Sequence, residues 1–308
     1  MAIPINLRTS MLSILIPNHN YPVEQLVTSL YHQLQKLEIE WEIRCYEDGS
    51  DEGSYLQNKE ALALIPNMHH QWIRKNMGRS AIRNKLAKDA KYPYLLFIDS
   101  DMQCEGEDFI ANYLKHKNEA DAIYGGVSYN LNKPEGKLLL RWQYGKHREV
   151  IPAMIRNGKP YISLKTCNLL IKKELMLKCP FDERLKKYGH EDTLHAILLS
   201  KIRASVLHIE NPMLHLGLED TEIFLEKSKM AMQNLAVMMD RDEQMLDEIN
   251  IVSFYRKIKK MKISNWLLFG FFLAEPLVVF ILISPFPSLY FYDIYKLGYL
   301  IKACNEKT

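Results

Sequence analysis

The stretch that decides the fold is YLLFIDSD, residues 94–101. A short apolar run without polar alternation is typical of a strand that is buried on both faces of a parallel sheet. The run ends directly in Asp99, Ser100 and Asp101. Two carboxylates one residue apart can share a hard divalent cation, which can neutralise a diphosphate. The alternative is an acidic turn that caps the next helix, but the position at a strand end favours a binding site.

Similar apolar runs recur along the chain and alternate with segments of helical spacing. The predicted strands cover residues 12–17, 41–46, 70–74, 94–98, 122–127, 164–171 and 204–209. This alternation predicts an α/β fold in which helices flank a mostly parallel central sheet. Ligands of such sheets bind at the carboxyl ends of the strands, where Asn18, Glu47-Asp48 and Asp99 occur. One further helix is predicted over residues 137–156.

The composition is that of an ordinary globular protein. The 308 residues are 47% hydrophobic and 25% charged, and the net charge of +3 gives no sign of nucleic-acid binding. The five cysteines are scattered without CxxC spacing, so we expect neither a zinc site nor a disulfide framework. The N-terminus lacks a charged segment followed by a long apolar run, so we expect no secretory signal and a protein that faces the cytosol.

Two further segments carry candidate binding groups. A carboxylate in Glu47-Asp48-Gly49-Ser50 can accept the imide hydrogen of uracil, although a plain Asp-Gly turn is the alternative. Residues 76–84 place a glycine at a helix start with Arg83 in the second turn. This arginine can pair with a diphosphate or brace the acidic turn, and a solvated surface arginine is the alternative.

Together these segments resemble the nucleotide-sugar-binding half of the family 2 inverting glycosyltransferases, whose fold is called GT-A. The match runs through SILIPNHN, EDGS, NMGRSAIRN and FIDSD, in the family's order, over roughly the first 130 residues. The resemblance implies that Pro17 and Asn20 border the nucleotide and that Asp48 contacts the base. Glu47 and Ile82 depart from the family, which usually has aspartate and alanine there.

The same resemblance implies a metal site at the acidic turn. Asp99 borders the ribose and the metal, Ser100 belongs to the same nucleotide-sugar-binding turn, and Asp101 ligates the metal directly. Several relatives use a histidine in the position of His215 as a third ligand, and neutral imidazole suits manganese. A structural histidine is the alternative for His215. The expected cofactor is Mn²⁺ or Mg²⁺.

A second match lies further along, where Tyr188-Gly189-His190-Glu191-Asp192 resembles the family's acceptor-side signature. Inverting transfer is a single in-line displacement, so a carboxylate must take the proton of the attacking hydroxyl. The resemblance implies that Asp192 is this base and that Glu191 binds the acceptor or the donor sugar. An acidic helix N-terminus is the alternative. Asn168 resembles a residue that lines the sugar pocket.

The C-terminal part is apolar and follows a basic cluster. Residues 266–283 carry one charge, Glu275, next to Pro276. A spanning helix, an interfacial hairpin and a buried core hairpin are the three interpretations, and the Glu-Pro pair favours an interfacial, membrane-associated form. The predicted organisation is a catalytic domain over 1–217, with a nucleotide-sugar-binding half (1–130) and an acceptor-binding half (131–217). A helical extension (218–262) and a membrane-associating tail (263–308) follow.

The sequence thus predicts a metal-dependent inverting glycosyltransferase at the inner face of the cell membrane. Its expected partners are a UDP-linked sugar donor and a growing surface glycan or lipid-linked saccharide, with no nucleic acid. One rival is a sugar-phosphate nucleotidyltransferase, which would require a glycine-rich, arginine-bearing loop after the first strand. The other is an inactive nucleotide-sugar-binding scaffold on the same fold, against which Asp48, Asp101, Glu191 and Asp192 argue together.

Overall fold

The computed structural model describes residues 11–185, 188–240 and 244–306. The N-terminal residues on which the secretion prediction rests lie outside these ranges. The chain forms two compact units, each assembled from three segments. Unit 1 comprises Met1–Ser128, Ile151–Lys186 and Leu198–Gly217, and unit 2 comprises Tyr129–Val150, Lys187–Ile197 and Leu218–Thr308.

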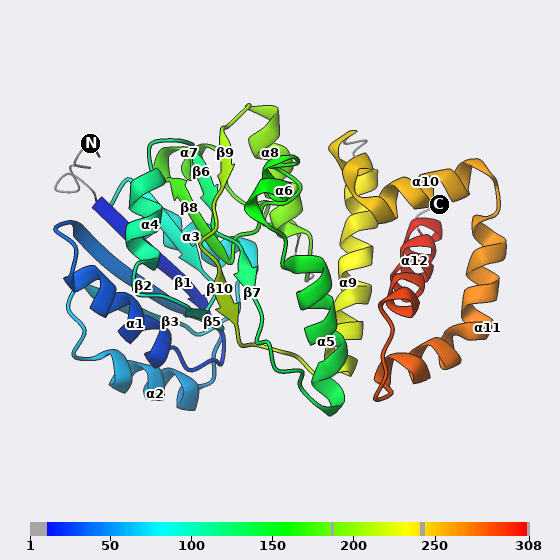
Figure 1. Ribbon diagram of the computed structural model, residues 1–308, viewed down its shortest axis with the longest axis horizontal. Coiled ribbons are helices and arrows are strands. Elements are labelled where there is room, and N and C mark those ends of the chain that lie inside the picture. Colours follow the sequence, from blue (N-terminus) through cyan, green and yellow to red (C-terminus); the bar gives the residue numbers. More distant parts are fainter. Residues whose placement is uncertain (1–10, 186–187, 241–243, 307–308) are drawn as a thin grey trace. The chain divides into compact units, whose positions relative to one another are not determined.

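Unit 1 is built on a seven-stranded sheet with the order β3-β2-β1-β4-β8-β6-β9 (Figure 1). The strands are β1 (Met11–Asn18), β2 (Glu40–Asp48), β3 (Met68–Ile73), β4 (Tyr94–Ile98), β6 (Ala122–Tyr124), β8 (Asn168–Lys172) and β9 (Val206–His208). The first four are parallel to one another, as are β6 and β9, while β8 runs antiparallel to both of its neighbours. The predicted mostly parallel α/β sheet is confirmed.

Helices connect and flank these strands. They are α1 (Glu24–Gln35), α2 (Glu52–Leu62), α3 (Arg79–Asp89), α4 (Phe109–His116), α6 (Ala153–Asn157) and α7 (Lys173–Lys178). The apolar side chains of α1 recur at helical spacing, and Leu26, Leu30 and Leu34 are buried. The Asp51 carboxylate accepts a hydrogen bond from the Ser54 amide at 2.8 Å and so caps the start of α2. Helix α8 (Glu191–Lys201) contributes residues to both units.

A second, three-stranded sheet includes the strand that directly follows the acidic turn. It has the order β5 (Met102–Cys104), β10 (Met213–His215) and β7 (Val127–Ser128). The single strand predicted over 122–127 is therefore wrong, because Gly125 and Gly126 redirect the chain from one sheet to the other. A Cβ atom on Gly125 would lie 2.4 Å from the Asn211 carbonyl oxygen, so only glycine allows this close approach. The strand predicted over 164–171 begins only at Asn168.

Unit 2 is helical within its described residues. Its longer elements are α5 (Leu139–Tyr144), the π-helix η3 (Gly145–Glu149), α9 (Thr221–Met239), α10 (Asn250–Lys260), α11 (Ser264–Ile283) and α12 (Leu289–Asn305), with short 3₁₀ turns η2 (Gly136–Leu138) and η4 (Gln244–Glu248). Helix α12 packs against both α9 and α11 (Figure 1). The single helix predicted over 137–156 is wrong, because the chain leaves helical geometry at Val150 and Pro152 restarts it as α6.

Candidate active site

The acidic turn begins where β4 ends, and Arg83 holds its first carboxylate. The Arg83 guanidinium, on α3, donates from Nη2 to Asp99 Oδ1 at 2.6 Å. Arg83 is 3% exposed, so this charge is buried beside its partner. The Asp99 amide also donates to the Cys167 carbonyl oxygen at 3.2 Å. Of the two roles considered for Arg83, the geometry matches the brace of the acidic turn.

The second carboxylate lies beside the predicted histidine. His215 Nε2 is 3.4 Å from Asp101 Oδ2, and the Leu216 amide donates to the Asp101 carbonyl oxygen at 2.9 Å. Antiparallel pairing of β5 with β10 places His215 opposite Met102, the residue after Asp101. Burial acts to raise the pKa of the Asp101 carboxyl, but the hydrogen bond and charge of His215 hold it below its ordinary value. This carboxylate therefore stays ionised at neutral pH.

Two residues that the sequence interpretation did not single out interact electrostatically with Asp101. Burial, and then the negative charge of Asp101, raise the pKa of the Tyr21 hydroxyl. Arg79, the exposed first residue of α3, adds a positive charge that helps to lower the pKa of Asp101. Arg79 lies in the NMGRSAIRN segment on which the resemblance rests, and Tyr21 directly follows its SILIPNHN segment. Their position at strand ends was the available signal.

Asp48 caps the segment that leads into α3. Its Oδ1 accepts from the Met77 amide at 2.6 Å and its Oδ2 from the Gly78 amide at 3.1 Å. Gly78 precedes α3 with φ of 91°, a conformation that favours glycine. Asp48 is 5% exposed. Each carboxylate oxygen has a second lone pair, so these two bonds still leave acceptor capacity.

Glu47 is a structural hub rather than a second binding carboxylate. Its Oε2 accepts from Asn18 at 2.9 Å and Ser50 at 2.6 Å, and its Oε1 accepts from Asn58 at 2.9 Å and lies 3.0 Å from His70 Nε2. A ligand atom of Cys45 also lies within 4.8 Å of those of Glu47 and His70. The hydrogen bonds occupy both carboxylate oxygens, which explains the cluster without a metal. The longer glutamate side chain reaches from β2 to both α2 and β3.

The other residues predicted to border the nucleotide lie in the same strand-end loops. Pro17 lies in β1 and pairs in register with Tyr46 of β2. Asn20 has φ of 52°, its amide donates to Ser50 Oγ at 3.0 Å, and its Oδ1 accepts from the Asp51 amide at 2.8 Å. Asn20 thereby ties the loop after β1 to the loop after β2. Ser100 is half-buried between the two aspartates.

Asn168 is committed to the interior of unit 1. Its Nδ2 donates to the carbonyl oxygens of Gly126 at 2.8 Å and Asn211 at 2.9 Å, and its Oδ1 accepts from the Tyr113 hydroxyl at 2.7 Å. The residue has no exposed surface. This geometry gives it no face toward a sugar and instead makes it the clamp that holds the Gly125-Gly126 bend.

The acceptor-side segment belongs to unit 2, and the aspartate turn belongs to unit 1. Gly189 and His190 have φ of 97° and 68°, and Glu191 begins α8. A Cβ atom on Gly189 would lie 2.6 Å from the Ala231 Cβ, and Asn234 Nδ2 donates to the Gly189 carbonyl oxygen at 2.8 Å. Helix α9 therefore fixes the turn that presents Glu191, which is buried, and Asp192, which is half-buried.

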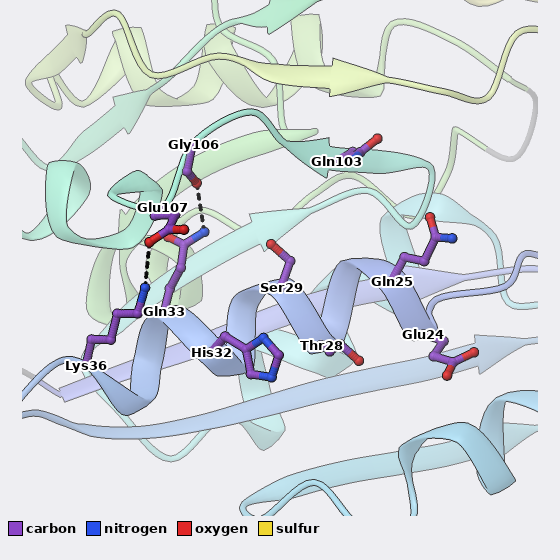
Figure 2. A pocket seen from close by; sticks show the side chains of 10 residues that line it. All are labelled: Glu24, Gln25, Thr28, Ser29, His32, Gln33, Lys36, Gln103, Gly106 and Glu107. Atoms are coloured by element: carbon purple, nitrogen blue, oxygen red, sulfur yellow. Dashed lines mark hydrogen bonds and ion pairs between the residues drawn. The ribbon is translucent and has the colours of Figure 1, made fainter.

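A pocket of about 730 Å³ lies over α1 (Figure 2). Its lining includes Thr28, His32 and Gln103, and also Lys36 and Glu107, which form an ion pair of 2.7 Å (Figure 2). Both members of that pair are well exposed to solvent. None of the predicted donor, metal or acceptor residues lines this pocket.

Comparison with solved structures shows which proteins share this fold. TarS residues 1–349 of S. aureus, solved in complex with UDP-GlcNAc, is similar with a TM-score of 0.54 and 16% identity, over 97% of this chain and 91% of that one. The mannosyltransferase PcManGT of Pyrobaculum calidifontis, solved with GDP-Man and Mn²⁺, gives a TM-score of 0.59 and 13% identity, over 96% and 86%. At these identities the likeness shows the GT-A type fold alone.

Sequence comparison shows the family. The uncharacterized glycosyltransferase YfnE of Bacillus subtilis (strain 168) is 30% identical over 117 residues, which cover 37% of this chain and 29% of that protein. The match thus spans less than a third of this relative's length. The family model described as "Glycosyl transferase family 2" matches residues 13–174, which is more than half of the 308 residues. The chain therefore belongs to glycosyl transferase family 2.

Proposed function

We propose that this glycosyltransferase moves a sugar from a UDP-linked donor to an acceptor hydroxyl, with inversion and with the help of a divalent metal. The observation that carries the proposal is the pairing of Asp101 with His215 beside the Asp99–Arg83 ion pair, at the end of β4. TarS and PcManGT were solved with nucleotide-sugars, which supports a donor of this class.

Mn²⁺ or Mg²⁺ is the proposed cofactor. The donor set fits, because Asp101 is ionised and its carboxylate lies beside an imidazole nitrogen, a combination that suits manganese. Asp101 and His215 would hold the ion. Asp99 would be the other carboxylate of the acidic turn beside the ion, and its ion pair with Arg83 would keep that turn in place. When bound, the metal neutralises the charge that develops on the diphosphate leaving group.

Chain residues at the strand ends bind the donor in this proposal. Pro17 and Asn20 border the nucleotide, and the free lone pairs of Asp48 accept the imide hydrogen of uracil. Ser100 lies within the same nucleotide-sugar turn. Arg79 is exposed and its charge acts on Asp101, so it can contribute positive charge toward a diphosphate. Asn168 acts indirectly, since it fixes the Gly125-Gly126 bend that leads to β7 beside β10.

Asp192 is the proposed general base and Glu191 the proposed sugar-binding carboxylate. An inverting displacement needs one group that takes the proton of the acceptor hydroxyl as it attacks the sugar. The rigid Gly189-His190 turn, anchored to α9, supports a carboxylate that must hold a fixed direction. The acceptor class is a growing surface glycan or lipid-linked saccharide at the cytoplasmic face of the membrane.

Two rival functions are separated by the donor chemistry. A nucleotidyltransferase would consume a nucleoside triphosphate and a sugar phosphate, whereas an inactive scaffold would bind nucleotide-sugars without turnover.

The proposal includes the domain organisation, with a catalytic domain over 1–217 and extensions over 218–262 and 263–308.

A panel of nucleotide-sugars with and without Mn²⁺ tests this function. We expect one or a few UDP-sugars to raise the melting temperature, because a ligand that binds only the folded state stabilises it by mass action. The same donors should be hydrolysed slowly to UDP and free sugar when no acceptor is present. Turnover of a nucleoside triphosphate with a sugar phosphate, or donor binding without any turnover, would instead support one of the rivals.

A further inference from the structure

Helix α11 presents a long apolar face to solvent. The helix has 20 residues, and its most apolar 18-residue window has a mean hydropathy of 2.4 but is only 17% buried. Eight large apolar side chains are exposed over 41–77% of their surface, namely Trp266, Leu267, Phe269, Phe272, Leu273, Leu277, Phe280 and Ile283. Contiguous apolar surface of this kind marks a site of contact with a membrane or another protein.

The opposite side of α11 is anchored within unit 2. Phe271, Val278 and Leu282 are buried in one core cluster with Phe224 of α9 and Tyr295 of α12. The charge within the helix is also accounted for, because the Tyr299 hydroxyl of α12 donates to the Glu275 carboxylate. Helix α11 therefore has one face that belongs to the core and one face that nothing in the described residues covers.

A basic cluster directly precedes this apolar face. Lys257, Lys259, Lys260 and Lys262 are exposed at the end of α10 and in the turn that leads into α11 (Figure 1). No acidic residue occurs between Glu248 and Glu275. Exposed lysines beside exposed apolar side chains match a surface that combines negative charge with hydrocarbon, which is the surface of an anionic lipid bilayer.

We propose that unit 2 binds one leaflet of an anionic membrane, with the exposed face of α11 at the acyl boundary and the lysines at the lipid phosphates. The helix lies in the plane of the interface and does not cross the bilayer. This proposal goes beyond sugar transfer, because the contact requires neither donor nor acceptor.

Length does not distinguish a spanning from an interfacial helix, since 20 residues extend about 30 Å and suffice to cross. The surroundings of α11 do distinguish them. Helix α12 packs along α11 and carries Asp293, which pairs with Arg148 at 2.9 Å and with Lys296 at 3.0 Å. A crossing would either draw these charges into hydrocarbon or pull α11 out of the core cluster. Only the exposed face is available to lipid.

Co-sedimentation of the full chain with preformed vesicles tests the proposal. We expect binding to vesicles of phosphatidylcholine with phosphatidylglycerol, at least about tenfold weaker binding to phosphatidylcholine alone, and loss of binding between about 0.1 and 0.5 M NaCl. The bound protein should also be released by alkaline carbonate. Equal binding to both vesicles, resistant to salt and carbonate, would overturn the proposal in favour of a spanning helix.

Two variants separate the two parts of the surface. Leu273→Glu with Leu277→Glu should lower vesicle binding at least about tenfold, and so should charge reversal of the four lysines. Leu177→Glu and Lys178→Glu are matched controls on exposed positions of unit 1 and should bind like the wild type. A chain that binds no vesicles but forms a dimer, which Leu277→Glu disrupts, would show that a second copy covers α11 and would overturn the proposal. Donor hydrolysis without vesicles reports on the transferase site separately.

Discussion

At the scale of single residues, the adjacent carboxylates Glu47 and Asp48 have different surroundings. Glu47 has four hydrogen-bonding neighbours and no exposed surface, while Asp48 accepts two backbone amides ahead of α3. The sequence predicted a carboxylate site at this strand end but could not assign the two roles. The partners Asn58 and His70 lie on other elements, and no local pattern marks them.

The Glu47→Gln variant tests whether the hydrogen bonds of the Glu47 carboxylate stabilise the fold. Burial acts to raise the pKa of Glu47, but hydrogen bonds from His70, Ser50, Asn58 and Asn18 hold it below its ordinary value. In acid the unfolded chain therefore binds more protons than the folded chain. The stabilisation by Glu47 is present above its unfolded pKa of about 4.3 and is lost as the pH falls through its lower folded pKa. We expect the variant to lose about 2 kcal/mol of unfolding free energy at neutral pH, because an amide replaces an acceptor among donors.

Urea unfolding at neutral and acidic pH measures this difference, with the exposed Glu60→Gln as the control. The wild type and Glu47→Gln should converge in stability as the pH falls below the lowered folded pKa of Glu47, where the carboxylate is protonated. A difference that stays constant with pH would show that the ionised form of Glu47 contributes nothing.

Asp192→Asn tests the proposed base. The amide cannot accept the proton of the acceptor hydroxyl, so transfer should fall about 100-fold or more while the affinity for the donor stays within about twofold. Transfer to an acceptor and donor binding are measured separately, and Glu222→Gln, 70% exposed on α9 of the same unit, is the control. Transfer at the wild-type rate would mean that another group is the base.

At the scale of elements, the long buried strands were predictable and the short ones were not. A continuous apolar run predicts strand β4, whereas β5, β7 and β10 have two or three residues each and no pattern of their own. The antiparallel direction of β8 was equally hidden, because an apolar run carries no information on direction. The approach of His215 to Asp101 depends on β10. The resemblance therefore suggested this contact, whereas the periodicity of the sequence did not.

Gly217→Ala tests whether the chain that directly follows β10 shapes the metal site. A Cβ atom there would lie 2.1 Å from Asp101 Oδ2, so the carboxylate must move. We expect the Mn²⁺ concentration for half-maximal donor hydrolysis to rise about tenfold or more, as for other changes that misorient a ligand. Gly106→Ala is the matched control, because nothing lies within 4 Å of its Cβ position. An unchanged Mn²⁺ requirement would separate β10 from the metal site.

At the scale of the whole molecule, the GT-A type domain was predictable, but the composition of the compact units was not. Each unit draws on three segments, so residues 129–150 and 187–197 join the C-terminal helices in unit 2. No boundary read along a sequence can express this interleaving, because it arises from contacts between distant segments. The predicted division by ligand at residue 130, and the predicted ends of the catalytic domain at residue 217 and of the helical extension at residue 262, stay predictions.

The central claim is that Asp101 and its neighbours bind a nucleoside diphosphate through a divalent metal. Calorimetric titration of UDP, with and without Mn²⁺, into the wild type, Asp101→Asn and the exposed control Asp108→Asn tests this claim most directly. The account predicts that Mn²⁺ tightens UDP binding at least about tenfold in the wild type and the control but not in Asp101→Asn. UDP affinity that is independent of Mn²⁺, or an Asp101→Asn variant that responds like the wild type, would contradict it.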